Sequence, residues 1–156
     1  MKTKKYFPLF MDLNSKKVMV VGGSTIAERR IRTLLDFVEE IWVIAPEISD
    51  GIRDLKEQGR IFWKKKRYER EDIYDADLVL AATDDRKVNE DIYSACKCLG
   101  ILVNTASDRR KCDFYFPGIL LEEDVVMGFN SGGDPVKSRE MRRKVERLLH
   151  QPGGKE

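Results

Sequence analysis

The sequence predicts an α/β fold of the Rossmann type, in which a parallel sheet is covered by helices on both faces. Apolar, strand-like segments alternate with segments of helical spacing through the first two thirds of the chain. The segment at residues 77–83 is apolar between polar ends, as expected for a strand in the middle of a parallel sheet. A glycine turn at Gly22 and Gly23 joins the first strand to the first helix.

The expected elements follow in chain order. Strands are expected at residues 18–21, 40–45, 60–64, 77–83 and 101–104. Helices are expected at about residues 26–37, from a cap at Ser49 to a stop at Gly59, and from Asp84 to a stop at Gly100. After Asn104 we expect a basic turn leading into aromatic residues at 109–118. A strand at 125–130 and a basic amphipathic helix at about 136–150 complete the pattern.

The length of 156 residues suits one domain with a core and a short appendage. We expect a dinucleotide-binding Rossmann domain at residues 1–112 and a segment at 113–150 that is too small for its own core. That segment is expected to fold against a partner subunit or the edge of the first domain. A flexible tail is expected at 151–156. The single histidine, His150, is expected at the surface where the last helix ends.

Composition excludes several classes of partner. The formal net charge of +2 gives no reason to expect a nucleic acid. No apolar run is long enough to span a membrane, and the N-terminus lacks the apolar core of a signal peptide. Cys96 and Cys98 lie two residues apart in an expected helix, so they point to different faces. These features favour a cytoplasmic protein with reduced thiols.

The glycine turn predicts an anion site built from backbone. The N–H groups and the positive dipole end at a helix N-terminus suit a pyrophosphate. The dinucleotide fingerprint G-x-G-x-x-G/A is met by Gly22 and Ala27, whereas Ser24 stands at its second position. Similar turns also occur in α/β proteins that bind no dinucleotide. The candidate cofactor-binding residues here are Gly22, Gly23, Ser24, Thr25 and Ile26.

Residues at the carboxyl ends of other strands extend this candidate site, because ligands of open parallel sheets bind there. The candidates are Ala45, Pro46 and Glu47 after the second strand, Thr83 and Asp84 after the fourth, and Asn104 in the fifth. In Rossmann domains that bind NAD, an acidic residue near the end of the second strand accepts a hydrogen bond from the ribose. Glu47 lies slightly beyond that strand, and no arginine stands there for a 2′-phosphate, so NAD is favoured as cofactor. Capping of the next helix explains Asp84 and Asp85 equally well.

At this point the chain resembles the precorrin-2 dehydrogenases, which form the N-terminal part of siroheme synthases. The motifs that carry the resemblance occur in the family's order at residues 6–13, 20–23 with 27–30, 45–47, 81–85, 100–104, 112–114 with Pro117, and 131–133 with Pro135. The resemblance implies NAD-dependent oxidation of precorrin-2, a tetrapyrrole, to sirohydrochlorin. It also implies a homodimer in which residues 113–150 are the dimerisation segment and the site lies between domains.

The resemblance further implies an aspartate base soon after the Val-Asn pair. Aligning Asn104 and Phe114 with the family puts Ser107 at that position and Asp108 one residue later, so Asp108 is the candidate base. The alternative is that Asp108 is a turn residue. The substrate's carboxylates require arginine forks and backbone N–H groups. The candidate substrate-binding residues are Arg109, Arg110, Ser131, Gly132 and Gly133.

Some family members also insert ferrous iron, and this second activity stays open for the chain. No Cys/His cluster here has the spacing of a metal site, so no bound metal is expected. The basic run at residues 64–67 is interpreted as solvated surface. Two other functions stay open. One is a catalytically degenerate member that binds NAD or the tetrapyrrole without turnover, and the other is a regulatory NAD-sensing Rossmann module.

Overall fold

The computed structural model describes residues 5–150, which divide into two compact units. The sheet unit comprises residues 11–114. The C-terminal unit comprises residues 115–150 together with the described residues 5–10. We expected residues 5–10 to belong with the sheet. They group with the C-terminal unit, where the ring of Tyr6 lies 4.7 Å from that of Tyr115. The expected flexible tail at 151–156 lies outside the described residues.

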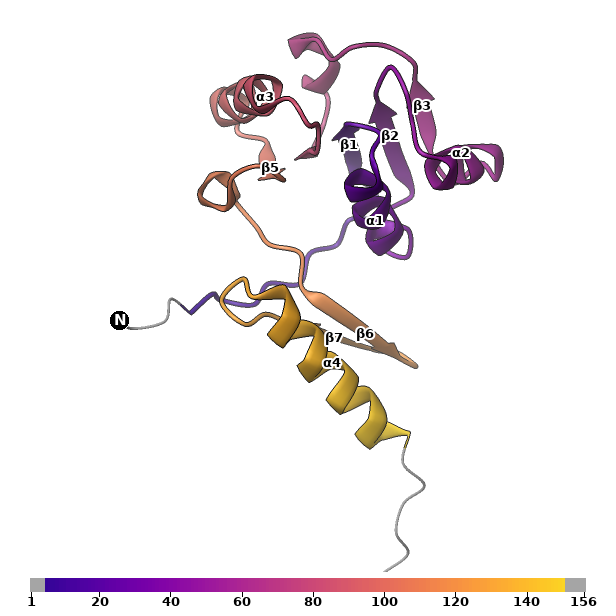
Figure 1. The fold of residues 1–156 in the computed structure, drawn as a ribbon, viewed down its shortest axis with the longest axis vertical. Helices are drawn as coiled ribbons and strands as arrows, with labels where there is room; N and C mark the ends of the chain where they lie inside the picture. Colours follow the sequence, from indigo (N-terminus) through magenta and orange to yellow (C-terminus); the bar gives the residue numbers. More distant parts are fainter. Residues whose placement is uncertain (1–4, 151–156) are drawn as a thin grey trace, which may run out of the picture. The chain divides into compact units, whose positions relative to one another are not determined.

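The sheet unit contains a five-stranded parallel sheet with the strand order β3-β2-β1-β4-β5 (Figure 1). Its strands are β1 (Lys17–Val21), β2 (Glu40–Ile44), β3 (Phe62–Lys64), β4 (Leu78–Ala81) and β5 (Leu102–Thr105). Its helices are α1 (Thr25–Leu34), α2 (Asp50–Glu57) and α3 (Arg86–Leu99), and two short 3₁₀ helices lie at Arg70–Ile73 and Arg109–Lys111. The order places β1 beside both β2 and β4, which is the Rossmann arrangement and confirms the predicted fold class.

The core lies on both faces of the sheet because alternate strand residues point to opposite faces. On one face, Met19, Val79 and Val103 pack with Ile92 and Cys96 of α3. The helices α1 and α2 cover the other face through the buried residues Ala27, Ile31, Leu34, Ile52 and Leu55 (Figure 1). Cys96 is buried and Cys98 exposed, as the sequence predicted. Burial raises the pKa of the Cys96 thiol to about 12.

The helix boundaries follow from their caps. Ser49 caps α2 by accepting a hydrogen bond from the Ile52 N–H at 3.3 Å. Asp85 caps α3 by accepting from the N–H groups of Lys87 and Val88 at 2.8 and 3.3 Å. The left-handed conformation of Gly100 (φ 72°) ends α3 as predicted. The helix therefore begins two residues later than expected, because Asp85 is its cap.

The C-terminal unit consists of a hairpin and a helix: β6 (Gly118–Glu122), β7 (Val125–Phe129) and α4 (Pro135–Leu149). The sequence predicted β7 and α4 but not β6, since residues 119–124 were assigned to no element and Gly118 was placed at the end of the expected turn at 109–118. The hairpin turns at Glu123 and Asp124, and Glu123 has a positive φ of 51°. His150 lies at the exposed end of α4, as expected, with its Nε2 3.7 Å from a carboxylate oxygen of Glu122.

Candidate dinucleotide site

The glycine turn after β1 is packed so closely that side chains are excluded at two positions. Gly22 has φ +121°, and a Cβ there would lie 2.3 Å from the Ala82 carbonyl oxygen of the chain after β4. At Gly23 a Cβ would lie 2.0 Å from the Glu47 carbonyl oxygen. The Ser49 N–H donates to the Gly23 carbonyl at 2.8 Å. The turn is therefore held between the segments that follow β2 and β4.

Ser24, Thr25 and Ile26 begin α1 on the exposed side of this turn. Ser24 is the N-cap residue, but its side chain makes no capping hydrogen bond. Its carbonyl accepts the Glu28 N–H at 2.9 Å, so the helix starts there. The N–H groups of a helix's first turn have no partner within the helix. Without a side-chain cap, the start of α1 keeps the backbone donors and positive dipole that a pyrophosphate requires.

The segment after β2 bears the candidate ribose ligand. Ala45 is buried, whereas Pro46 and Glu47 are exposed. The indole N–H of Trp63 donates to the Ala45 carbonyl at 3.0 Å, which fixes the end of β2 against β3. Ser49 also donates through its hydroxyl to Glu28 of α1 at 2.7 Å. That hydrogen bond, followed by the contact with Arg32, lowers the pKa of Glu28.

The residue after β4, Thr83, is clamped by a side chain that the sequence analysis missed. Asn89 of α3 is fully buried. Its Oδ1 accepts from the Thr83 hydroxyl at 2.8 Å and from the Thr83 N–H at 3.2 Å, and its Nδ2 donates to the Thr83 carbonyl at 2.9 Å. The side chain of Asp85 is engaged in capping α3, while Asp84 is exposed. A polar residue at an otherwise apolar helix position was the only sequence signal for Asn89.

The end of β5 is closed by the loop that follows it. Asn104 is buried and donates from Nδ2 to the Phe114 carbonyl at 2.7 Å. Its Oδ1 is buried and has no partner among the described residues. The Thr105 N–H donates to Cys112 Sγ at 3.2 Å, and its hydroxyl donates to the Lys111 carbonyl at 3.2 Å. Burial raises the pKa of the Cys112 thiol, so this sulfur acts as a packed hydrogen-bonding group.

Asp108, the candidate base, caps the 3₁₀ helix Arg109–Lys111. Its carboxylate accepts from the Arg110 N–H at 2.9 Å and pairs with the Arg110 guanidinium, with Nη2 at 2.9 Å. These contacts lower the pKa of Asp108 to about 2. The Asp108 side chain is only 12% exposed, whereas that of Arg110 is 89% exposed. Ser107 and Arg109 are also exposed on this loop.

Ser131, Gly132 and Gly133 lie in the other unit, in the turn between β7 and α4. The Ser131 N–H donates to the Ser138 hydroxyl at 3.0 Å, and the Gly133 N–H donates to Asn130 Oδ1 at 3.2 Å. The N-terminus of α4 lies at this turn, but its first N–H groups are not free to bind an anion. Instead the carboxylate of Asp134 accepts from the N–H groups of Val136 and Lys137. The cap occupies those donors and brings a negative charge.

The donor set of the sheet unit fits a dinucleotide. Two side-chain-free positions, an exposed uncapped helix start and an acidic residue beyond β2 meet at the carboxyl ends of β1 and β2. These features match the requirements of a pyrophosphate and an adjoining ribose. Among the described residues, no group of three His, Cys, Asp or Glu side chains is arranged to hold a metal ion. None of the described helices is both long and apolar enough to cross a membrane.

Residues 9–118 match the model of a family described as "Putative NAD(P)-binding". The chain belongs to this NAD(P)-binding family. It is 40% identical over 147 residues to a siroheme synthase of Mannheimia succiniciproducens, covering 94% of this chain and 31% of that protein. It is 34% identical over 152 residues to a siroheme synthase of Nitrosococcus oceani, covering 97% of this chain and 32% of that protein. The chain thus spans about a third of these relatives.

A solved structure is similar along most of the chain. It is SirC, a precorrin-2 dehydrogenase, which matches with a TM-score of 0.74 and 27% sequence identity. The match covers 92% of this chain and 71% of the SirC chain. Because so much of the chain is covered, the likeness extends to the C-terminal unit as well as the sheet unit. NAD(P) is therefore the cofactor class of this fold, as the glycine turn predicted.

Proposed function

We propose that the protein is an NAD-dependent dehydrogenase that oxidises precorrin-2 to sirohydrochlorin on the route to siroheme. The observation that carries the proposal is the likeness to a precorrin-2 dehydrogenase over 92% of the chain. The siroheme synthases among its relatives support the same substrate class, a tetrapyrrole. The packed glycine turn supports the cofactor.

In this reaction a carbon of the macrocycle loses a hydride and a proton is also removed. When bound, NAD supplies the hydride acceptor. The start of α1 would hold its pyrophosphate, and Glu47 would accept a hydrogen bond from its adenosine ribose. Asn89 fixes Thr83, so the strand end beside the glycine turn keeps one position. Pre-set positions of this kind lower the entropic part of the barrier.

Asp108 is the proposed proton acceptor, and Arg110 controls its strength. A carboxylate with a pKa of about 2 is a weak base at neutral pH. The exposed Arg110 guanidinium is also suited to bind a carboxylate of the substrate. A substrate carboxylate that takes over Arg110 would release Asp108 and raise its pKa. Base strength would then increase only when the tetrapyrrole is bound.

Two substitutions at Asp108 separate catalysis from capping, because asparagine caps a helix as well as aspartate does. Purified protein is incubated anaerobically with precorrin-2 and NAD, and sirohydrochlorin and NADH are followed by absorbance. We expect Asp108→Asn to keep the capping hydrogen bond, to lose only the stability that the charge pair adds, and to lower kcat by about 10²-fold or more. Asp108→Ala should lose the capping hydrogen bond as well as turnover. The exposed Asp36→Asn is the control and should turn over normally.

Full turnover by Asp108→Asn would reduce Asp108 to a capping residue while leaving the dehydrogenase intact. No turnover by the wild-type protein, with NAD still bound, would instead identify a binder without catalysis.

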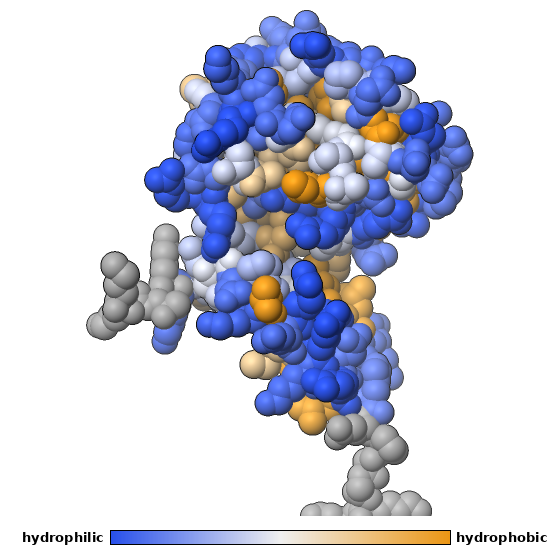
Figure 2. Space-filling model, viewed as in Figure 1, coloured by the Kyte–Doolittle hydropathy of each residue, from blue (hydrophilic) through white to orange (hydrophobic). Residues whose placement is uncertain are grey.

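We further propose that the protein works as a homodimer through its C-terminal unit. A hairpin with one helix is too small to bury a core of its own. Leu121, Val125 and Met141 are 44%, 55% and 51% exposed, and Figure 2 shows apolar side chains among the charges of this unit. A second copy would cover them. Light scattering should give the mass of a dimer for the wild-type protein and of a monomer for Val125→Glu.

A further inference from the structure

The basic run after β3 does not behave as uniform solvated surface. The ammonium of Lys64 lies 5.0 Å from the ring centre of Trp42. Lys66 pairs with Glu69 and Asp72, at 2.5 and 3.2 Å. Of these three lysines, Lys65 is the one whose ammonium pairs with the residue after β2, with Nζ 3.8 Å from Oε1 of Glu47. The proposed function uses Glu47 but gives no role to Lys65.

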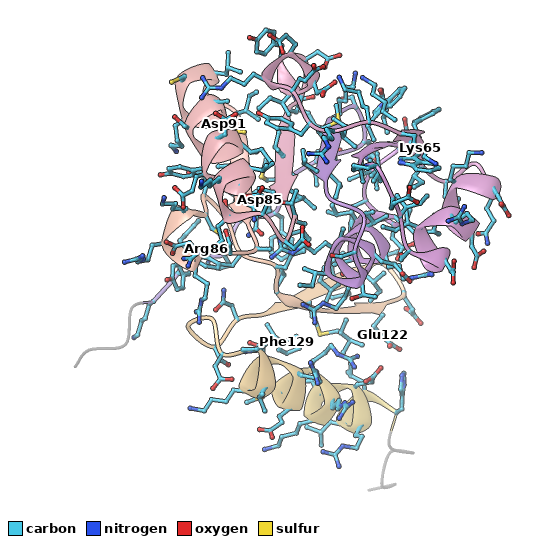
Figure 3. All side chains as sticks on the ribbon, turned by 45° about the horizontal axis from the view of Figure 1, so that its top comes forward. Lys65, Asp85, Arg86, Asp91, Glu122 and Phe129 are labelled. Atoms are coloured by element: carbon cyan, nitrogen blue, oxygen red, sulfur yellow. The ribbon has the colours of Figure 1, made fainter. Side chains whose placement is uncertain are left out.

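The main chain holds Lys65 in this place. The Ala45 N–H donates to the Lys64 carbonyl at 3.3 Å, and the Trp63 indole donates to the Ala45 carbonyl at 3.0 Å. Residues 63 and 65 point to the same side because strand side chains alternate. The Lys65 ammonium lies 5.8 Å from the Trp63 ring centre, and Figure 3 shows Lys65 beside α2. Lys65 therefore lies next to the segment after β2 that contains Glu47, the candidate residue for binding the ribose.

We infer that Glu47 and Lys65 together set the selectivity of this protein between NAD and NADP. The inference deepens the cofactor part of the proposed function and rests on it. The two cofactors differ only at the adenosine 2′ position, which is a hydroxyl in NAD and a phosphate in NADP. Glu47 accepts a hydrogen bond from the hydroxyl and repels the phosphate. Lys65 neutralises Glu47 in the absence of phosphate and attracts a phosphate once Glu47 is removed.

The backbone geometry gives Glu47 this position. Its carbonyl oxygen occupies the space that a Gly23 Cβ would need, at 2.0 Å, so Glu47 adjoins the pyrophosphate turn directly. The Glu47 and Lys65 side chains are 80% and 64% exposed, so both are accessible to a ligand. An ion pair this exposed contributes little to stability and is easily exchanged for a ligand. A charge-assisted contact to phosphate is stronger than this pair.

The test measures the dissociation constants of NAD and NADP separately by calorimetry on the full chain. The proteins are the wild type, Glu47→Gln, Lys65→Met and the double variant. We expect the wild type to prefer NAD. Glu47→Gln should bind NADP about tenfold more tightly than the wild type does, the gain typical of one charge-assisted hydrogen bond. Adding Lys65→Met should abolish that gain, and Lys65→Met alone should weaken NADP further.

Lys64→Met is the matched control, because it removes the same charge from the neighbouring residue on the other side of the strand. It should leave both constants unchanged. The inference is overturned if the double variant binds NADP as tightly as Glu47→Gln does, or if Lys64→Met has the effect of Lys65→Met. It is also overturned if Glu47→Gln leaves the preference unchanged or the wild type binds neither cofactor. Selective binding without oxidation of precorrin-2 would remove the proposed reaction and keep this inference.

Discussion

The two units of the chain bury their apolar side chains to different degrees. The sheet unit has a continuous core in which Met19, Val79 and Ile92 are fully buried. In the described part of the C-terminal unit, Leu120 is the only apolar side chain that is buried. The exposed faces of β7 and α4 carry valine, leucine and methionine instead. The sheet unit thus has the core of an independent fold, while the C-terminal unit has an apolar surface that a partner can cover.

Truncating one buried side chain in each unit tests this difference most directly. Ile92→Ala removes atoms from the packed contact between α3 and the sheet, and should lower the free energy of unfolding by about 2–5 kcal/mol. Leu120→Ala should cost less than half as much, because few buried neighbours surround it. Urea unfolding followed by tryptophan fluorescence measures both. Equal costs would mean that the C-terminal unit has a core comparable with that of the sheet.

The sheet was predictable from the sequence because its signals are local. The apolar run of β4, the cap at Ser49 and the left-handed stop at Gly100 each lie within a few residues of the feature that they determine. Strand β6 was missed because its sequence, Gly-Ile-Leu-Leu-Glu, directly follows the aromatic segment and does not alternate between apolar and polar residues. Its pairing with β7 is the evidence for it, and pairing is not visible in one segment.

The part of the candidate site that is formed by backbone groups was predictable from the sequence. Gly22 and Gly23 belong to a local motif that can be recognised in the sequence alone. The clamp of Asn89 on Thr83 and the approach of Lys65 to Glu47 join different elements, so they depend on how the strands end together. The ion pair between Asp108 and Arg110 could not be read from the sequence either. Only the folded loop shows that this carboxylate is held as a cap.

Replacing one glycine in each unit with alanine gives a second, smaller contrast. Gly23→Ala would place a Cβ 2.0 Å from the Glu47 carbonyl, so the segment after β2 must move. We expect a loss of about 1–3 kcal/mol in stability and a clear loss of NAD affinity. Gly128→Ala in β7 meets only Pro117, at 3.7 Å or more, and should be nearly neutral. Thermal melts and calorimetric titration with NAD would show both, and normal NAD affinity in Gly23→Ala would contradict the close packing of the turn.

Acid should weaken the sheet unit through its paired carboxylates, and Asp108 gives the smallest and most specific of these effects. The Arg110 guanidinium and N–H lower the pKa of Asp108 from 3.8 to about 2. A carboxyl whose pKa is lower in the folded state stabilises the fold above its unfolded value and loses that contribution as the pH falls. The loss should therefore occur between about pH 4 and pH 2. Asp108→Asn keeps the cap but cannot ionise, so unfolding curves of the two proteins should differ above pH 4 and converge near pH 2. Curves that coincide at every pH would mean that capping rather than charge makes Asp108 stabilising, and that Arg110 does not lower the basicity of this carboxylate.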